Sequence, residues 1–174
     1  MSLLRSVLFT PGNQQRRVEK ARTCGADAVI LDLEDTIPPA EKESTRRYVG
    51  EVLATMQVPT AIVRVNGLHT GWTAADLEAV MRPELHIVIV PKVQSAAEVA
   101  EADRLMRNIE ERKGLAPGKV RLIPIVETAR GVLNAFPIAS ASPRVLTLAF
   151  GAADYTSDMG VPWVKDPLQL VYAR

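Results

Sequence analysis

The feature that most constrains this chain is the regular alternation of short apolar runs with longer segments of helical periodicity. Runs of four to seven residues rich in Val, Ile and Leu are typical of strands buried on both faces, as in a parallel sheet. Each helical segment is long enough to cross back over the sheet between parallel strands. We therefore predict a βαβα series with strands at 6–10, 28–33, 61–66, 87–90, 120–126 and 145–150 and helices at 14–23, 40–56, 73–81, 96–113 and 129–140.

The spacing of these runs narrows the fold class to two parallel architectures. The strand starts span 139 residues in five steps, a mean of about 28 residues, which suits a strand with its crossover helix. A doubly wound open sheet and a (β/α)8 barrel both fit this repeat. Eight such units need about 224 residues, whereas the chain has 174. One domain of about six units is expected, followed by a loop at 155–163 and the beginning of a helix at 166–174.

The overall charge and composition exclude several classes of function. Twenty-one Lys and Arg against 20 Asp and Glu give a net charge of +1, so no global field attracts nucleic acid or an anionic membrane. No apolar run approaches the ~18 residues of a membrane-spanning helix. We expect a cytoplasmic protein with neither nucleic-acid nor membrane partners. Cys24 is the single cysteine, which argues against an internal disulfide and a zinc site.

Polar residues follow the apolar runs, at the strand ends where ligands bind in both candidate architectures. Glu127 and Asp154 follow the fifth and sixth runs, so we expect them at adjacent strand ends. Two carboxylates with room for water suit the octahedral oxygen shell of Mg²⁺. The alternative is structural, because strand-end carboxylates also cap the helices that follow them. Both interpretations stay open at this point.

Two basic residues occupy comparable positions. Arg64 lies inside the third run, where a guanidinium needs a partner, either a substrate carboxylate or an internal one such as Glu34 or Asp35. We expect both in part, with the acidic pair orienting Arg64 and one face of it left for a ligand. Lys92 follows the fourth run and would form a Schiff base with a ketone only if its pKa were lowered. A solvated or phosphate-facing lysine is the alternative.

Taken in order, six strand-end motifs resemble one family. LFTPGN, DAVILDLEDTIPPAEK, IVRVNG, VIVPKV, LIPIVETARG and LAFGAADYTSDMG are similar to the citrate lyase beta subunit-like group of the HpcH/HpaI aldolase superfamily. The resemblance implies a (β/α)8 TIM-barrel enzyme that uses Mg²⁺, or alternatively Mn²⁺. It also implies cleavage or formation of a 3-hydroxyacyl-CoA such as citryl-, malyl- or citramalyl-CoA, with an acyl-CoA and a 2-oxo acid as products. An acyl-carrier-protein thioester is the alternative to CoA, and a homo-oligomer, trimer or hexamer, is expected.

The same resemblance assigns roles to individual residues. It implies that Arg64 binds a substrate carboxylate, that Glu127 and Asp154 bind the metal, and that Glu34 and Asp35 line the same site. The seventh and eighth strands of the family, with an extension that supplies an acid–base aspartate, have no counterpart in residues 1–174. We therefore expect an incomplete barrel of about six βα units in one domain, with C-terminal units missing and a doubtful activity alone.

The missing units imply two exposed strand edges and partly uncovered apolar residues at 28–33 and 122–126. Two other functions remain as alternatives to the lyase. One is a non-catalytic CoA-ester-binding or assembly subunit, and the other is a Schiff-base aldolase that uses Lys92.

Overall fold

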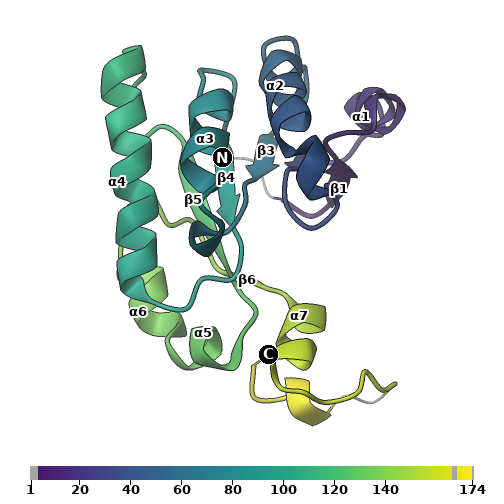
Figure 1. The fold of residues 1–174 in the computed structure, drawn as a ribbon, viewed down its shortest axis with the longest axis vertical. Helices are drawn as coiled ribbons and strands as arrows, with labels where there is room; N and C mark the ends of the chain where they lie inside the picture. The colour runs from purple at the N-terminus through teal and green to yellow at the C-terminus, as the bar shows by residue number, and fades with distance from the viewer. Residues whose placement is uncertain (1–3, 166–167, 174) are drawn as a thin grey trace.

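Six parallel strands, paired in the order in which they occur along the chain, form the centre of the molecule. The computed structural model describes residues 4–165 and 168–173. Each strand pairs only with its sequence neighbours, which excludes a doubly wound sheet because that order reverses at a switch point. The sheet curls into a half-barrel (Figure 1). Its strands are β1 Val7–Pro11, β2 Ala28–Asp32, β3 Ala61–Arg64, β4 Ile87–Val90, β5 Arg121–Val126 and β6 Ala149–Phe150.

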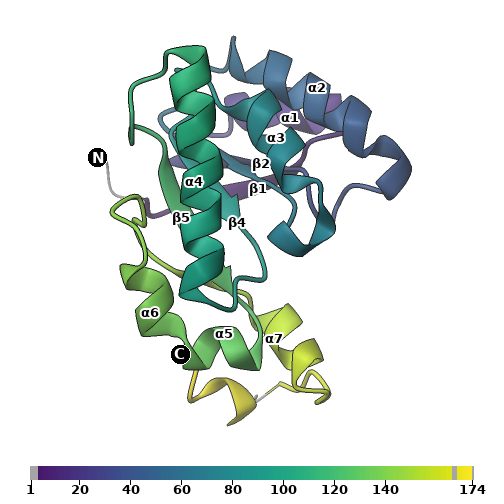
Figure 2. The same cartoon turned by 60° about the vertical axis from the view of Figure 1, so that its left-hand side comes forward.

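Helices lie between the strands and cover the outer face of the sheet. Figure 2 shows the first four α-helices as one layer against the strands. Two predicted ranges, 87–90 and 96–113, agree with β4 and α4 at both ends. The α-helices are α1 Gln15–Arg22, α2 Lys42–Leu53, α3 Thr73–Val80, α4 Ala96–Lys113, α5 Ala129–Leu133, α6 Ala135–Ser140 and α7 Ala152–Asp158, with short 3-10 helices η1 Pro39–Glu41, η2 Leu68–Thr70 and η3 Leu168–Leu170.

Local signals explain why α4 begins and ends where it does. Ser95 accepts a hydrogen bond from the Glu98 N–H, and the Glu98 carboxylate accepts from the Ser95 N–H, which is a capping box. At the other end Gly114 adopts a left-handed conformation with φ 62°, which a residue without Cβ reaches at little cost. Both ends are therefore determined by residues close in sequence.

Two apolar layers fill the half-barrel. The outer layer packs the sheet against the helices and includes Leu31, Val63, Val88 and Met106. The inner layer faces the barrel interior and consists of residues that alternate with the outer ones along the strands: Ala28, Ile30, Ile62, Ile87, Ile89, Ile123 and Ile125. This alternation on both faces is the reason that the strands are continuously apolar in sequence.

Exposure at the open side of the barrel differs from the expectation. The apolar residues of β2 and β5 are buried, with Ile30 2% and Ile123 6% exposed, so the prediction that they lack cover was wrong. Exposure is instead concentrated in β1, where Val7, Leu8 and Phe9 are 43%, 39% and 49% exposed. β1 pairs only with β2, and the prediction that the first strand is buried on both faces was also wrong.

The largest departures from the predicted elements lie after β5. The helix predicted at 129–140 is interrupted at Asn134, whose side chain donates to the Gln94 carbonyl at 2.8 Å. The strand predicted at 145–150 is paired only at Val145, through an isolated bridge to Leu122, and at 149–150.

Residues beyond the last strand also differ. The first part of the loop predicted at 155–163 belongs to α7. Of the helix predicted at 166–174, residues 166–167 and 174 lie outside the described residues, and 168–173 form η3 and a turn. Within the described part of the chain, no helix is long and apolar enough to cross a membrane.

Candidate functional site

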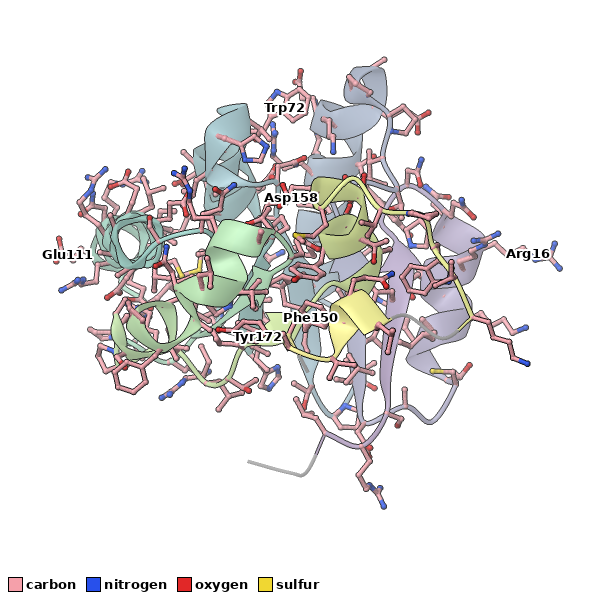
Figure 3. The ribbon with its side chains drawn as sticks, turned by 90° about the horizontal axis from the view of Figure 1, so that it is seen from below. Arg16, Trp72, Glu111, Phe150, Asp158 and Tyr172 are labelled. Carbon is pink, nitrogen blue, oxygen red and sulfur yellow. The ribbon has the colours of Figure 1, made fainter. Side chains whose placement is uncertain are left out.

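The carboxyl ends of the strands bring the candidate residues to one edge of the half-barrel, which we call the rim. Strand register places Asp32 at the end of β2 directly beside Arg64 at the end of β3. It also places Val126 of β5 beside Phe150 of β6, so Glu127 and the start of α7 are neighbours. Figure 3 looks onto the molecule from below and shows Phe150 near its centre, with Asp158 of α7 close by.

Arg64 is held mainly by a carboxylate that the sequence analysis did not select. Its Nε and Nη2 donate to the two oxygens of Asp32 at 2.6 and 2.8 Å. Its Nη1 lies 3.0 Å from Glu34 Oε2. Glu34 is thus a partner as predicted, whereas Asp35 is not bonded to Arg64 and pairs with Lys92. The signal for Asp32 was its position two residues after Ile30, on the same face of β2.

The buried Asp32 carboxylate is held by several hydrogen bonds. Besides Arg64, it accepts from the Glu34 N–H at 3.0 Å and from the Thr36 hydroxyl at 2.6 Å. Burial opposes its charge, but these hydrogen bonds outweigh burial and lower the pKa of Asp32. The Arg64 guanidinium also lies 5.1 Å from the centre of the Phe9 ring. Asp32 therefore sets the plane of the Arg64 fork while one edge of the fork faces Phe9 and Glu34.

Lys92 links two parts of the rim. Its backbone N–H donates to Glu127 Oε1 at 2.8 Å, and its ammonium donates to Glu34 and, at 3.1 Å, to Asp35. Burial opposes the charge of Lys92, but the two carboxylates outweigh it and raise the pKa of the ammonium. A Schiff base needs a neutral amine, so this environment argues against the aldolase alternative for Lys92.

Glu127 and Asp154 form a carboxylate pair. Glu127 is 2% exposed, and burial together with the neighbouring Asp154 raises the pKa of Glu127 to about 7, against the opposing Lys92 hydrogen bond. Gly151 makes the close approach possible, because a Cβ there would lie 2.7 Å from the Glu127 Cβ. The neighbouring Asp154 carboxylate therefore adds to the burial that disfavours the charged form of Glu127.

Residues other than Glu127 make the hydrogen bonds that cap the helix after β5. α5 is capped by Thr128, whose hydroxyl accepts from the Gly131 N–H at 3.0 Å. Asp158 accepts from the Ala129 N–H at 2.8 Å. Asp154 lies in the first turn of α7, whose N-cap is Gly151, and makes no side-chain cap hydrogen bond there. Other residues therefore cap the helix start after β5, whereas Asp154, in the first turn of α7, lies where a carboxylate also interacts favourably with the helix dipole.

The donor set of this pair fits Mg²⁺. Among the described residues there is no group of three or more His, Cys, Asp or Glu side chains that could hold a metal. Mg²⁺ commonly binds through one or two carboxylates and completes its oxygen shell with water and substrate. Glu127 and Asp154 provide that number of carboxylates, and the Glu127 side chain occupies the space that a Cβ at Gly151 would fill. We conclude that these residues fit the group, with further oxygens supplied from outside the protein.

A second buried network supports the loops that carry the acidic residues. The Lys42 ammonium donates to the Leu33 and Glu34 carbonyls at 2.7 Å and to Asn66 Oδ1 at 2.6 Å. Asn66 in turn donates to Asp76 at 2.6 Å. The sequence analysis quoted Lys42 within a motif but assigned it no role. Its function depends on a loop nine residues away folding back onto it, which residue type alone does not reveal.

The sequence of the chain matches a known protein family and curated relatives. The chain matches the HpcH/HpaI aldolase/citrate lyase family over residues 5–174. Citrate lyase subunit beta from Leuconostoc mesenteroides subsp. cremoris is 37% identical over 174 residues, which cover 99% of this chain and 58% of that protein. This chain therefore spans less than two thirds of the curated relative's length.

Solved structures from Mycobacterium tuberculosis show the same fold. A citrate lyase beta subunit complexed with oxaloacetate and magnesium has a TM-score of 0.74 and 32% identity, covering 95% of this chain and 67% of that one. A protein in complex with magnesium, acetoacetate and coenzyme A has a TM-score of 0.73 and 31% identity, covering 94% of this chain and 55% of that one. The chain belongs to the HpcH/HpaI aldolase/citrate lyase family.

Proposed function

We propose that this chain carries the substrate-binding and metal-binding half of a carbon–carbon lyase acting on a 3-hydroxyacyl thioester. The observation that carries the proposal is that the oriented guanidinium of Arg64 and the Glu127–Asp154 carboxylate pair both follow strand ends and are linked through Glu34 and Lys92. A 2-oxo acid has both a carboxylate and an adjacent oxygen, which are the groups that a guanidinium and a divalent ion recognise. The oxaloacetate, magnesium and coenzyme A bound in the related structures support this assignment.

The roles of the residues follow from their surroundings. Arg64 binds the substrate carboxylate through the edge of its fork that Asp32 leaves unused. Glu127 and Asp154 hold Mg²⁺, with Mn²⁺ as the alternative ion, and the ion would supply a positive charge beside the substrate oxygen. Glu34 and Asp35 keep Lys92 in place beside them. Residues of the inner apolar layer below exclude water and strengthen these charged contacts.

The bond changes of the proposed reaction balance without a redox partner. The carbon–carbon bond between the hydroxyl-bearing carbon and the carbon next to the thioester breaks, and its electron pair moves into the thioester enolate. The hydroxyl loses its proton and becomes the ketone of the 2-oxo acid. Protonation of the enolate then yields the shorter acyl thioester. Citryl-, malyl- and citramalyl-CoA, or the matching acyl-carrier-protein thioesters, satisfy this scheme.

The exposed apolar residues of β1 are compatible with assembly of the chain into a homo-oligomer.

Isothermal titration calorimetry tests the binding part of the proposal. Mg²⁺ is titrated first, and oxaloacetate or pyruvate second, into the parent chain and the variants Glu127→Gln and Asp154→Asn. Both variants are expected to lose most of the Mg²⁺ affinity, because each removes a charged oxygen ligand. Glu111→Gln on the outer face of α4 (Figure 3) is the matched control and is expected to bind as the parent does. Unchanged Mg²⁺ binding in both rim variants contradicts the assignment.

A cleavage assay separates the lyase from the non-catalytic alternative. Citryl- or malyl-CoA is incubated with the chain and Mg²⁺, and release of the 2-oxo acid is measured. An enzyme releases the acid only with the metal present. A CoA-ester-binding or assembly subunit binds the thioester, as measured by calorimetry, and releases none.

A further inference from the structure

Lys92 has a backbone conformation that differs from every other side-chain-bearing residue described in this structure. Its φ of 56° makes it the one positive-φ residue other than glycine among those described. The left-handed region is unfavourable for residues with a Cβ, and it persists only where surrounding contacts hold it. Such residues concentrate at binding and catalytic sites. The contacts that hold Lys92 are therefore informative.

This conformation lets one residue contact two distant parts of the rim. The backbone N–H points to Glu127 Oε1, which follows β5. The side chain extends the other way, past β3, to Glu34 and Asp35, which follow β2. The following residue, Val93, donates its N–H to the Ile125 carbonyl at 3.1 Å, which keeps the turn on β5. A change at Lys92 therefore acts on both halves of the site.

Glu34 is placed between two cations. One oxygen accepts from Lys92, and the other lies 3.0 Å from Arg64 Nη1. Without the ammonium of Lys92, Arg64 would be the one described residue that forms an ion pair with the Glu34 side chain, since Lys42 bonds to the Glu34 backbone carbonyl. Glu34 Oε2, which contacts Nη1 without an aligned hydrogen bond, would then turn further toward Arg64 and bond to the N–H groups that a ligand carboxylate would use.

We propose that Lys92 is a positioning residue that keeps the Arg64 fork open by holding Glu34, while its backbone N–H orients Glu127 independently of the side chain. The proposal rests on the proposed function, because it names what the site must do to bind a 2-oxo acid. It separates two roles within one residue. The side chain controls the carboxylate-binding half, and the backbone controls the metal-binding half.

Four variants test this separation by calorimetry with Mg²⁺ and, at saturating Mg²⁺, oxaloacetate. Lys92→Gly keeps the N–H and the left-handed turn but removes the side chain. Lys92→Met keeps the length and removes the charge. In both, the oxaloacetate Kd is expected to rise by about tenfold, the loss of one charge-assisted hydrogen-bond arrangement, while the Mg²⁺ Kd of Lys92→Gly stays within about twofold. Lys92→Arg is expected to restore most of the oxaloacetate affinity, and Lys113→Met, at a paired lysine on α4, is expected to change neither.

A double variant tests whether Lys92→Met weakens oxaloacetate binding through Glu34 or through a general disturbance of the site. Adding Glu34→Gln to Lys92→Met removes the competing charge, so oxaloacetate affinity is expected to recover relative to Lys92→Met alone. A further loss in the double variant would overturn the proposal. An equal loss of Mg²⁺ and oxaloacetate affinity in Lys92→Gly would also overturn it, because a purely structural residue affects both.

Hydrogen exchange provides a readout that needs no ligand. The Glu34 and Thr36 amides donate to Asp32, and release of Glu34 from Lys92 is expected to speed their exchange in Lys92→Met but not in Lys113→Met. Unchanged exchange contradicts the positioning role. If the parent chain binds neither Mg²⁺ nor oxaloacetate, the proposed function fails, and the exchange comparison still decides whether Lys92 holds Glu34.

Discussion

Two buried ion networks at opposite ends of the strands differ in how fully their charges are paired. The basal network consists of Arg144, Asp103, Glu110 and Ser142, near the start of β5. Arg144 is 4% exposed, and it donates to Asp103 at 2.6 Å, to both oxygens of Glu110 and to the Val120 carbonyl. Ser142 donates to Asp103 at 2.9 Å. Burial opposes the charge of Asp103, but Arg144 outweighs it and lowers the pKa of that carboxyl.

The rim network of Asp32, Glu34, Arg64 and Lys92 is less completely paired. Glu34 Oε2 is buried without an aligned hydrogen bond, although it lies 3.0 Å from Arg64. Burial raises the pKa of Glu34 in spite of its two cationic neighbours. Burial also raises the pKa of Glu127, to about 7. Unsatisfied buried charge costs stability. The comparison teaches that the basal network holds the fold together, whereas the rim retains polar groups that a ligand can complete.

Breaking the basal network is expected to give the largest effect on stability. Arg144→Met leaves Asp103 and Glu110 buried without their cation, and the free energy of unfolding should fall by about 3–5 kcal/mol. Urea denaturation followed by circular dichroism measures this loss. Adding Asp103→Asn and Glu110→Gln should recover part of it, because the stranded charges are then gone. A loss below about 1 kcal/mol would show that this network is no tighter than a surface ion pair.

The rim arginine is expected to affect binding more than stability. Arg64→Lys keeps the charge beside Asp32 but loses the planar fork, so the binding free energy of oxaloacetate should weaken by about 1–3 kcal/mol. Calorimetry in the presence of Mg²⁺ gives the affinity, and a urea titration of the same sample gives the stability. Equal oxaloacetate affinity in both proteins would make Arg64 a structural residue like Arg144.

The raised pKa of Glu127 predicts a pH-dependent metal affinity. Mg²⁺ needs the charged carboxylate, so its Kd should be about tenfold weaker at about pH 6 than at about pH 8. In the metal-free chain the free energy of unfolding changes with pH in the opposite direction to the Mg²⁺ affinity. The protonated form of Glu127 is favoured in the folded chain, so this contribution to stability is present below the ordinary glutamate pKa of 4.5 and is lost as the pH rises through about 7. Mg²⁺ titrations and urea denaturation at several pH values test the two predictions, and Glu127→Gln should remove both pH dependences.

The smallest effect is expected at the support of the carboxylate pair. Asp158→Asn weakens one hydrogen bond to the Ala129 N–H, which should lower the free energy of unfolding by about 0.5–1 kcal/mol. The Mg²⁺ affinity should change little, because Asp154 stays in the first turn of α7. Thermal melts and Mg²⁺ titration measure the two effects. A large loss of Mg²⁺ affinity with unchanged stability would make Asp158 part of the metal site.

Prediction from sequence succeeded where neighbouring residues determine the structure. The capping box at Ser95 and the left-handed Gly114 explain why α4 was predicted to the residue, and apolar periodicity located the strands. It failed after β5, where the predicted helix breaks at Asn134. In a continuous helix Pro137 would clash with the Leu133 carbonyl, a local signal that the prediction did not use. The rim location of Arg64, Glu127 and Asp154 was expected, since parallel strands end at one edge. The partnership of Arg64 with Asp32 was not, because it requires the register of two strands.

The sequence by itself determined the order of strands and helices as far as β5, both ends of α4 and the type of residue at each strand end. These properties depend on periodicity and on hydrogen bonds between residues a few positions apart. The tertiary structure alone decided which charges meet. Lys92 joins Glu127 and Glu34, which are 35 and 58 residues from it, and its left-handed backbone is held by those contacts. Pairings over such separations follow from strand register and burial, which no local pattern encodes.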